Sequence, residues 1–330
     1  MSATVEAPRL APAPGVASRS RPRRAARSRI RSGRYAPFYL APALLIFLTF
    51  VIGPAIFVLF ISFFNWDLLN ASMSHFVGGS NYINLFGSQA FWQAVLVSVY
   101  FVGVAVSASV AFGLGIALLL SGAGWLRRVV RLAVLTPYFT PVVATSIVWI
   151  WIFNPQFGLL DSVLHIARIP TENWLESTTL ALPAVIVYTL WHNIGFTVII
   201  FLAGLATVSQ ELREAARVDG ASRFREVWHV VVPQLSQVTL FVAVITTIDS
   251  LQAFTQFWTM TQGGPLGSTT TLGYLLYEDN FVFYHTGPAA AIAVVLFVAI
   301  AAFTLAQLRV AKRRTAGLAA NHKRHRGDKT

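Results

Sequence analysis

The sequence contains no cysteine among its 330 residues, which excludes disulfide bonds and thiolate metal sites. It is also poor in charge, because Asp, Glu, Lys and Arg make up 12% of the chain, whereas soluble domains carry about 25%. Hydrophobic residues make up 55%, which is more than the core of a soluble domain accounts for. Together these features indicate a protein that is largely embedded in a membrane.

Sequence motifs that carry catalysis are absent as well. The chain has no GxxxxGK[ST], HExxH or GxSxG sequence, and no group of His and acidic residues with the spacing of a metal site. Without a P-loop, the chain has no motif of its own for holding the phosphates of ATP. We therefore expect no enzymatic activity, no bound cofactor and no metal site.

The net charge of +12 is concentrated at the two ends of the chain. Eight Arg lie in residues 19–34, and eight Lys or Arg lie in residues 309–329. Basic ends that flank apolar segments are typical of cytoplasmic tails, and no nucleic-acid recognition motif accompanies them. We interpret residues 1–34 as a disordered basic cytoplasmic tail, and residues 311–330 as a second basic cytoplasmic tail.

Six apolar segments are long enough to cross a bilayer, which takes about 20 helical residues. They are continuously apolar rather than alternating, which favours helices over barrel strands. The first is longer than the core of a signal peptide, about 7–15 residues, so we expect it to be retained. The six segments lie near residues 35–66, 92–120, 131–153, 180–204, 236–258 and 286–309.

The distribution of positive charge supports this count. With both termini in the cytoplasm, Arg168 is the one residue of the 25 Lys and Arg that falls in an outer loop. The sequence thus predicts an all-α membrane protein with six transmembrane helices at residues 35–310. Gly113 and Gly115, inside the second segment, indicate close packing against another helix.

One polar loop, residues 205–235, interrupts the apolar chain and contains the sequence EAARVDGASRFREVWHVVVP. Ser209 and Ser222 are suited to cap helices, and Gly220 is suited to end one. The loop therefore predicts two short helices that meet at Gly220, with Pro233 marking the join to the next span. Its charged rim around a small apolar patch suits docking into a groove of a partner or lying on lipid headgroups, and composition leaves both open.

This loop resembles the EAA loop of binding-protein-dependent ABC importer permeases. In that family EAA is followed by three residues, Gly, nine residues and I-x-L-P. The same spacing occurs here, although Val230 and Val232 replace Ile and Leu. The residues that carry the resemblance are Glu214, Ala215, Ala216, Asp219, Gly220 and Pro233.

Two further elements narrow the resemblance. The sequence TQGGP at residues 261–265, followed by Thr269 to Thr271, resembles the T-x-G-G-P…T motif of carbohydrate-type permeases. Asn81 and Tyr82 resemble an NY element of the first outer loop in the same proteins. Over roughly residues 37–310 the chain is similar to permeases of the maltose and glycerol-3-phosphate systems, specifically the MalF/UgpA-like member of a permease pair.

The resemblance implies a type I, MetI-like fold and the import of a sugar or related polyol. It also implies that the EAA loop contacts an ATPase, so that ATP and Mg are used by that partner. The expected partners are a second homologous permease, two ATPase subunits and an extracytoplasmic solute-binding protein. The expected location is the inner membrane of a prokaryote, with several spans.

Polar side chains at membrane depth are costly and usually face a cavity or a partner. Two clusters are therefore candidates for the substrate path, and the resemblance favours both. A spacing of three or four predicts Asp249, Gln252 and Gln256 on one helix face. The candidates are Trp191, His192, Asn193 and Gly195 in the fourth apolar segment, and Asp249, Ser250, Gln252 and Gln256 in the fifth.

A third cluster comprises Trp149, Trp151 and Asn154. Each cluster also has a structural interpretation. The two tryptophans are typical of a membrane-interface belt, His192 of a hydrogen-bonded packing residue, and Asp249 of a contact with a second permease.

An ion-gradient-driven secondary transporter or channel is the alternative function. It predicts several ionisable residues within the spans and often two inverted halves. The sequence shows one clear intramembrane acid, Asp249, and no obvious internal repeat. No cation is clearly placed near the polar clusters, which favours a neutral sugar over an anionic substrate.

Overall fold

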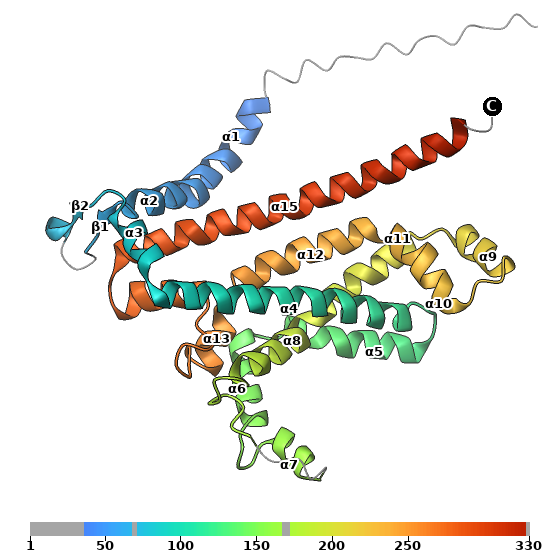
Figure 1. The fold of residues 1–330 in the computed structure, drawn as a ribbon, viewed down its shortest axis with the longest axis horizontal. Helices are drawn as coiled ribbons and strands as arrows, with labels where there is room; N and C mark the ends of the chain where they lie inside the picture. The colour runs from blue at the N-terminus through green and yellow to red at the C-terminus, as the bar shows by residue number, and fades with distance from the viewer. Residues whose placement is uncertain (1–35, 68–70, 167–171, 328–330) are drawn as a thin grey trace, which may run out of the picture. The chain divides into compact units, whose positions relative to one another are not determined.

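The computed structural model describes residues 36–67, 71–166 and 172–327 (Figure 1). The predicted tail at residues 1–34 and Arg168 lie outside this part of the chain. Contacts divide the chain into two units, residues 1–53 and 54–330, which are described separately. The first unit contains helix α1 (Ala36–Phe47) and a π-helical turn, η2 (Leu48–Ile52), which buries no side chain.

The second unit is helical apart from a short antiparallel hairpin, in which Phe64 pairs with Phe76 and Asn65 with His75. The hairpin consists of β1 (Phe64–Asn65) and β2 (His75–Phe76). Its longer helices are α2 (Gly53–Ile61, starting at the unit boundary), α4 (Gln89–Leu120), α5 (Trp125–Leu135), α6 (Val142–Ile152), α8 (Ala181–Ala206), α12 (Ser236–Leu251) and α15 (Thr286–Gly327). Its shorter helices and turns are η3 (Ala71–Met73), α3 (Ser80–Gly87), η4 (Thr136–Phe139), α7 (Leu159–Ile166), α9 (Gln210–Val218), α10 (Arg223–Glu226), η5 (Val227–Val231), α11 (Val232–Gln234), α13 (Thr255–Met260), α14 (Leu272–Tyr277) and η6 (Glu278–Val282).

Four helical segments of the described chain are long and apolar enough to cross a membrane by themselves. Two bent helix pairs raise the number to six if each pair is one span. The four segments are Tyr39–Ile61, Gln89–Leu120, Ala181–Ala206 and Thr286–Val310. The bent pairs are Trp125–Phe139 with Val142–Ile152, at 104°, and Arg223–Gln234 with Ser236–Leu251, at 68°.

The prediction of uninterrupted third and fifth spans is wrong. In the third, α5 ends at Leu135, and Pro137 and Pro141 separate it from α6. Proline interrupts a helix because it has no N–H to donate and its ring clashes with the preceding turn. In the fifth, the helix predicted at residues 236–258 ends at Leu251, and a new helix begins at Thr255.

The core of the second unit lies where α4, α8, α12 and α13 meet. Phe101 of α4 and Phe257 of α13 are fully buried, with ring centroids 4.9 Å apart in an edge-to-face arrangement. Buried polar groups also join the helices, since the Ser98 hydroxyl accepts a hydrogen bond from the backbone N–H of Leu272 over 2.9 Å. The helices are therefore tied by packing and by specific hydrogen bonds.

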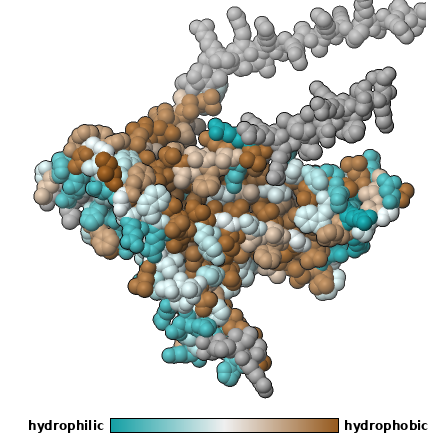
Figure 2. Space-filling view, viewed as in Figure 1, coloured by the Kyte–Doolittle hydropathy of each residue, from teal (hydrophilic) through white to brown (hydrophobic). Residues whose placement is uncertain are grey.

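The apolar surface is extensive on the long helices. Half of the most apolar window of α8 is buried, compared with 28% for α4 and 22% for α15. Figure 2 shows hydrophobic residues over the long helices of the second unit, and hydrophilic residues around α7 and around α9 and α10. This division places α8 at the centre of the fold and leaves the sides of α4 and α15 for lipid or partner helices.

Close packing of α4 on α8 depends on Gly113 but not on Gly115. A Cβ at Gly113 would lie 2.4 Å from the side chain of Thr197, whereas a Cβ at Gly115 would meet nothing within 4 Å. Real atoms do not approach to 2.4 Å, so a side chain at Gly113 would push the two helices apart. The expected close packing is thus confirmed for one of the two glycines.

We expect Gly113→Ala to destabilise the purified protein by about 1–3 kcal/mol, because overpacking displaces α4 from α8. Gly115→Ala is the matched control, and should leave stability unchanged or raise it slightly, since Ala favours helix. Thermal unfolding in detergent measures both. Equal stability of the two variants would contradict the packing described here.

Candidate functional site

A break between α12 and α13 opens a polar cavity in the second unit. Residues 252–254 are not helical, and a cavity of about 160 Å³ lies beside them. In this segment Ala253 is buried, Phe254 is half-buried and Gln252 is exposed. The cavity is lined by Val142, Tyr188, Thr189, His192, Asn193, Asp249, Gln252, Ala253, Phe254, Thr255 and Gln256.

His192 and Asn193 form one hydrogen-bonded unit in this wall. His192 Nδ1 lies 2.9 Å from the side-chain oxygen of Asn193, and Nε2 lies 3.1 Å from the carbonyl of Thr140. Both partners are oxygen acceptors, and a neutral imidazole has one N–H, so each neutral tautomer of His192 donates to one of the two. His192 thus lies between Asn193 and the backbone at the proline break.

Aromatic rings adjoin the cavity. Trp149 of α6 contacts Trp191 and Tyr188 of α8, with ring centroids 5.3 and 6.0 Å apart. The Tyr188 hydroxyl, which is held 2.8 Å from the Thr145 hydroxyl, belongs to the cavity wall. Trp191 lies beside this wall without lining it. The rings thus form an apolar rim next to the carboxamides.

Two predicted residues lie away from the cavity. A Cβ at Gly195 would lie 2.4 Å from the carbonyl oxygen of Val134, so Gly195 lets α8 approach the end of α5. Ser250 is buried but does not line the cavity. In the third cluster, Trp151 is exposed and the Asn154 side chain accepts backbone hydrogen bonds in its own loop. None of these four residues lines the cavity.

The prediction that Asp249, Gln252 and Gln256 share one helix face is wrong, because the helix ends at Leu251. The three side chains nevertheless reach the same cavity, with Gln252 in the break and Gln256 on α13. A broken helix, rather than one helix face, therefore brings these three side chains together.

The polar loop forms the two predicted helices. The Ser209 and Ser222 hydroxyls accept hydrogen bonds from Leu212 and Arg225 N–H groups, each over 3.4 Å. Gly220 has a φ of +80°, and the N–H of Ala221 bonds the carbonyl of Ala216 over 2.9 Å. This is a Schellman end, for which glycine is the favoured residue because it has no Cβ. Both caps and the turn were predictable because they are local.

Helix α9 presents an exposed surface. Glu214 and Ala215 are exposed, and Glu214 accepts a hydrogen bond from Gln210 over 2.7 Å. Val218 of α9 and Phe224 of α10 are also exposed, at 87% and 72%. The EAA residues thus lie on an accessible helix with apolar side chains at its end.

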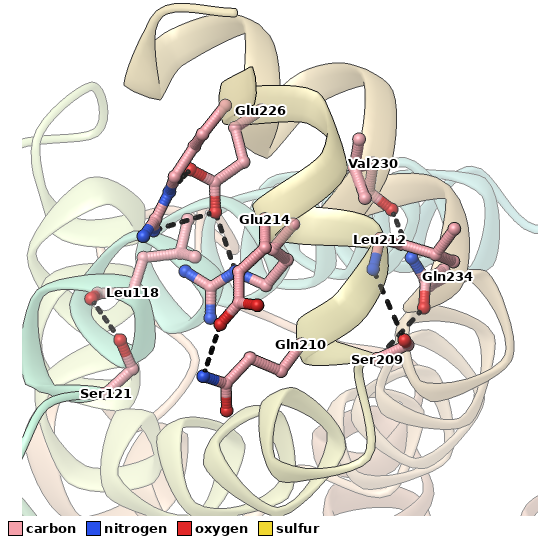
Figure 3. A network of polar contacts seen from close by, with 11 residues as sticks. Leu118, Ser121, Ser209, Gln210, Leu212, Glu214, Glu226, Val230 and Gln234 are labelled. Carbon is pink, nitrogen blue, oxygen red and sulfur yellow. Dashed lines mark hydrogen bonds and ion pairs between the residues drawn. The ribbon is translucent and has the colours of Figure 1, made fainter. Parts of the chain in front are cut away.

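An ion-pair network lies behind this surface (Figure 3). Arg213 Nε donates to Glu226 over 2.7 Å, and Arg217 Nε donates to the other carboxylate oxygen over 2.8 Å. Hydrogen bonding to Glu226 raises the pKa of the Arg217 guanidinium above its ordinary value. Sequence reasoning missed this network, because residues 9 and 13 positions apart on separate helices follow no spacing rule.

A comparison with sequence models of known families identifies the family of this chain. The sequence model of the family described as "Binding-protein-dependent transport system inner membrane component" matches residues 109–316. This range includes both the cavity and α9. The chain belongs to this family.

Relatives of this permease include sugar transport proteins. It is 31% identical to the trehalose/maltose transport system permease protein MalF of Thermococcus litoralis, over 86% of this chain and 95% of the relative. It is 30% identical to the sulfoquinovosyl glycerol permease protein SmoG of Agrobacterium fabrum, over 83% and 89%. It is 31% identical to the sn-glycerol-3-phosphate permease protein UgpA of the same organism, over 84% and 95%.

Solved structures show the same fold. A chain of a bacterial ABC transporter for import of the acidic polysaccharide alginate matches with a TM-score of 0.75, at 20% identity, over 86% of the permease and 97% of that chain. The alginate transporter in complex with its pentasaccharide-bound periplasmic protein matches with a TM-score of 0.76, at 20% identity, over 86% and 96%. The expected all-α permease fold is therefore confirmed.

Threonines hold together the GGP loop of the permease. The Thr261 and Thr269 hydroxyls lie 2.7 Å apart, and Thr269 donates to the carbonyl of Gly264 over 2.8 Å. Thr270 donates to the carbonyl of Gly263 over 3.0 Å. The motif thus builds one compact turn.

The side chain of Asn81 likewise stabilises a loop, the one that follows α2. Its amide donates to the carbonyls of Ser62 and Phe64, both over 2.9 Å. The two motif elements therefore hold loops in place.

A second cavity, which the sequence did not indicate, adjoins the GGP loop. It has a volume of about 300 Å³, and its wall includes Gln93, Tyr274 and Glu278. Burial, followed by the charge of Asp279, raises the pKa of Glu278. The raised pKa means that the fold disfavours the ionised carboxylate.

This pKa shift predicts how stability depends on pH. An acid with a raised pKa in the folded state lowers stability as pH rises from its unfolded pKa through its folded pKa. Glu278→Gln should therefore raise the thermal midpoint at pH 7, and the gain should vanish below about pH 4, where wild-type Glu278 is protonated. Glu176→Gln, at an exposed loop position, is the control. A gain that persists at low pH would contradict this assignment.

Proposed function

We propose that this chain is a transmembrane permease subunit of an ATP-driven ABC importer for a neutral sugar or related polyol. The observation that carries the proposal is the convergence of polar side chains from α8, α12 and α13 on one cavity, in a chain that belongs to the permease family. Polar groups at membrane depth are expected along a substrate path. The trehalose/maltose permease protein among its relatives supports a neutral sugar as the substrate class.

The chemistry of the cavity suits a neutral polyhydroxyl ligand. Asn193, Gln252 and Gln256 supply carboxamides that donate to and accept from hydroxyl groups. Neither Lys nor Arg occurs among its described lining residues, so the site offers no counter-ion to an anionic substrate. Trp191, which is partly exposed beside the cavity wall, offers an aromatic face for the C–H surface of a sugar, whereas the Tyr188 ring is buried.

The size of the cavity suits one half of a shared site. Its volume of about 160 Å³ is below the roughly 300–1,000 Å³ of most ligand sites. In the proposed complex, a second homologous permease supplies the opposite wall. The path then lies between the two permeases, and access alternates between the two sides of the membrane.

The proposed complex also explains the exposed loop helix. Helix α9 docks on an ATPase subunit, of which there are two, and those subunits bind and hydrolyse ATP with Mg while this chain binds no cofactor. An extracytoplasmic binding protein delivers substrate to the outer loops. The assembly lies in the inner membrane of a prokaryote, with both termini of this chain in the cytoplasm.

Cavity variants test the substrate path. We expect Gln256→Ala and Asn193→Ala each to lower sugar uptake by about 2- to 10-fold, the equivalent of one hydrogen bond. Ser250→Ala is the matched control, because Ser250 is buried near the break but outside the cavity. Uptake of labelled sugar by cells that express the complete transporter is the measurement. A larger loss in Ser250→Ala than in the cavity variants would contradict the assignment.

Substitutions at Gly220 test whether α9 couples the ATPase to uptake. A β-branched side chain at φ +80° is strained by at least about 1–2 kcal/mol, so Gly220→Val should reorient α9 and uncouple ATP hydrolysis from uptake. Gly220→Asn should be milder, because Asn tolerates positive φ. Uptake and co-purification of the ATPase are measured together. Wild-type values of both in Gly220→Val would refute the coupling role.

A further inference from the structure

Helix α9 has little packing to hold it in place. None of its residues is buried, although it runs from Gln210 to Val218. Its neighbours in space are mainly η5 and α10, and α10 is only four residues long. The orientation of α9 must therefore come from polar contacts rather than from a hydrophobic core.

The polar contact that meets this need is the Glu226 clamp, defined as Glu226 with Arg213 and Arg217. Glu226 is only 2% exposed, and each of its carboxylate oxygens accepts from a different arginine, over 2.7 and 2.8 Å. Arg217 adds a second hydrogen bond over 3.2 Å. The two arginines are four residues apart, so they project from one face of α9, and both reach the same carboxylate.

The clamp is not needed to form α9. The helix begins with the Ser209 cap and ends with the Gly220 turn, both of which are local. A buried carboxylate is costly unless it is paired, and paired guanidinium groups hold it in a defined geometry. The clamp therefore sets how α9 is oriented on α10, not whether α9 is helical.

From Glu226 the chain leads directly to the cavity. The next turn, η5, contains Val231, which is 1% exposed, and Leu235 at the following bend is equally buried. Leu235 contacts the backbone region of Gly204 at the end of α8. Beyond it, α12 extends to Asp249 in the cavity wall. The segment from Glu226 onward is thus anchored by buried side chains, whereas α9 is held by the clamp and, at its cap, by the Ser209 N–H, which donates to Gln234 over 3.4 Å.

We infer that Glu226 is a positioning residue that joins α9 to α10 as one rigid unit, so that force on α9 reaches α12 and the cavity. The inference deepens the proposed function and rests on it, because it requires α9 to dock on an ATPase. Glu226 lies outside the residues of the EAA pattern. Its burial and its two arginines assign it this role.

The first test is Glu226→Gln in the complete transporter. Gln keeps the shape but loses the charge, so we expect uptake to fall roughly tenfold, within the range of couplings in one ion-pair network. The ATPase should still co-purify, and should hydrolyse more ATP per sugar imported. Arg225→Gln is the control, because it removes a charge from α10 without touching the clamp, and it should match wild type.

The mobility of a spin label on α9 reports how firmly this helix is held. The chain has no cysteine, so Val218→Cys accepts a single nitroxide at an exposed site of α9. Glu226→Gln should increase label mobility in the permease before the ATPase is added, and Arg225→Gln should not. If Glu226→Gln fails to accumulate, Arg217→Gln leaves the Arg213 pair in place and should give a smaller change of the same kind.

The outcomes separate the two proposals. If Gly220→Val is inactive, the coupling role of α9 stands. Wild-type uptake or unchanged label mobility in Glu226→Gln then overturns the positioning role of Glu226. An equal loss in Arg225→Gln overturns it as well, because the effect would then follow any charge change on α10. If Gly220→Val leaves uptake and ATPase association unchanged, the coupling role fails and both proposals are overturned.

Discussion

Backbone groups in the hydrocarbon core of a bilayer have no water to bond, so a helix can break there only beside a cavity or a partner. This constraint explains the arrangement of the permease. At the proline break between α5 and α6, the carbonyl of Thr140 lies 3.1 Å from His192 Nε2 in the cavity wall. The break between α12 and α13 brings Gln252 into the cavity wall. Two interruptions on facing elements thus create a polar cavity in an apolar protein.

The same chain links this cavity to the exposed loop. Helix α9 lies near the C-terminal end of α4, the end opposite α3, in Figure 1. Its contacts pass through Glu226 and the buried Leu235 to α12, which ends at the cavity break. This continuous segment is the connection through which the proposed coupling between the exposed loop and the cavity would act.

Local features of this structure were predictable from the sequence. The apolar segments, the Ser209 cap and the Gly220 turn depend on neighbouring residues, and each occurs where it was expected. The acid, the amides and the histidine of the cavity wall were named from the sequence because they stand out in apolar segments, whereas Tyr188, Thr189 and Thr255 were missed. Their assignment to a straight helix was wrong, since the ending of α12 at Leu251 depends on packing around the break.

Non-local features were not predictable. The two arginines that pair with Glu226 lie on another helix. The bends of 104° and 68° depend on how the helices pack against one another. Gly195 lies next to the polar cluster in the sequence and was therefore predicted in the substrate path. In the structure it is a packing contact with Val134, which depends on how α5 and α8 lie against each other. Pairwise contacts across helices thus decided which polar or small residues face the cavity.

The most direct measurement is sugar uptake by proteoliposomes that contain this permease with its second permease, the ATPase and the binding protein. If the chain forms the path of an ATP-driven importer, uptake will require ATP and the ATPase, and will persist when ionophores collapse the proton and sodium gradients. Uptake that needs an ion gradient and proceeds without ATP would contradict this assignment, and would favour a secondary transporter.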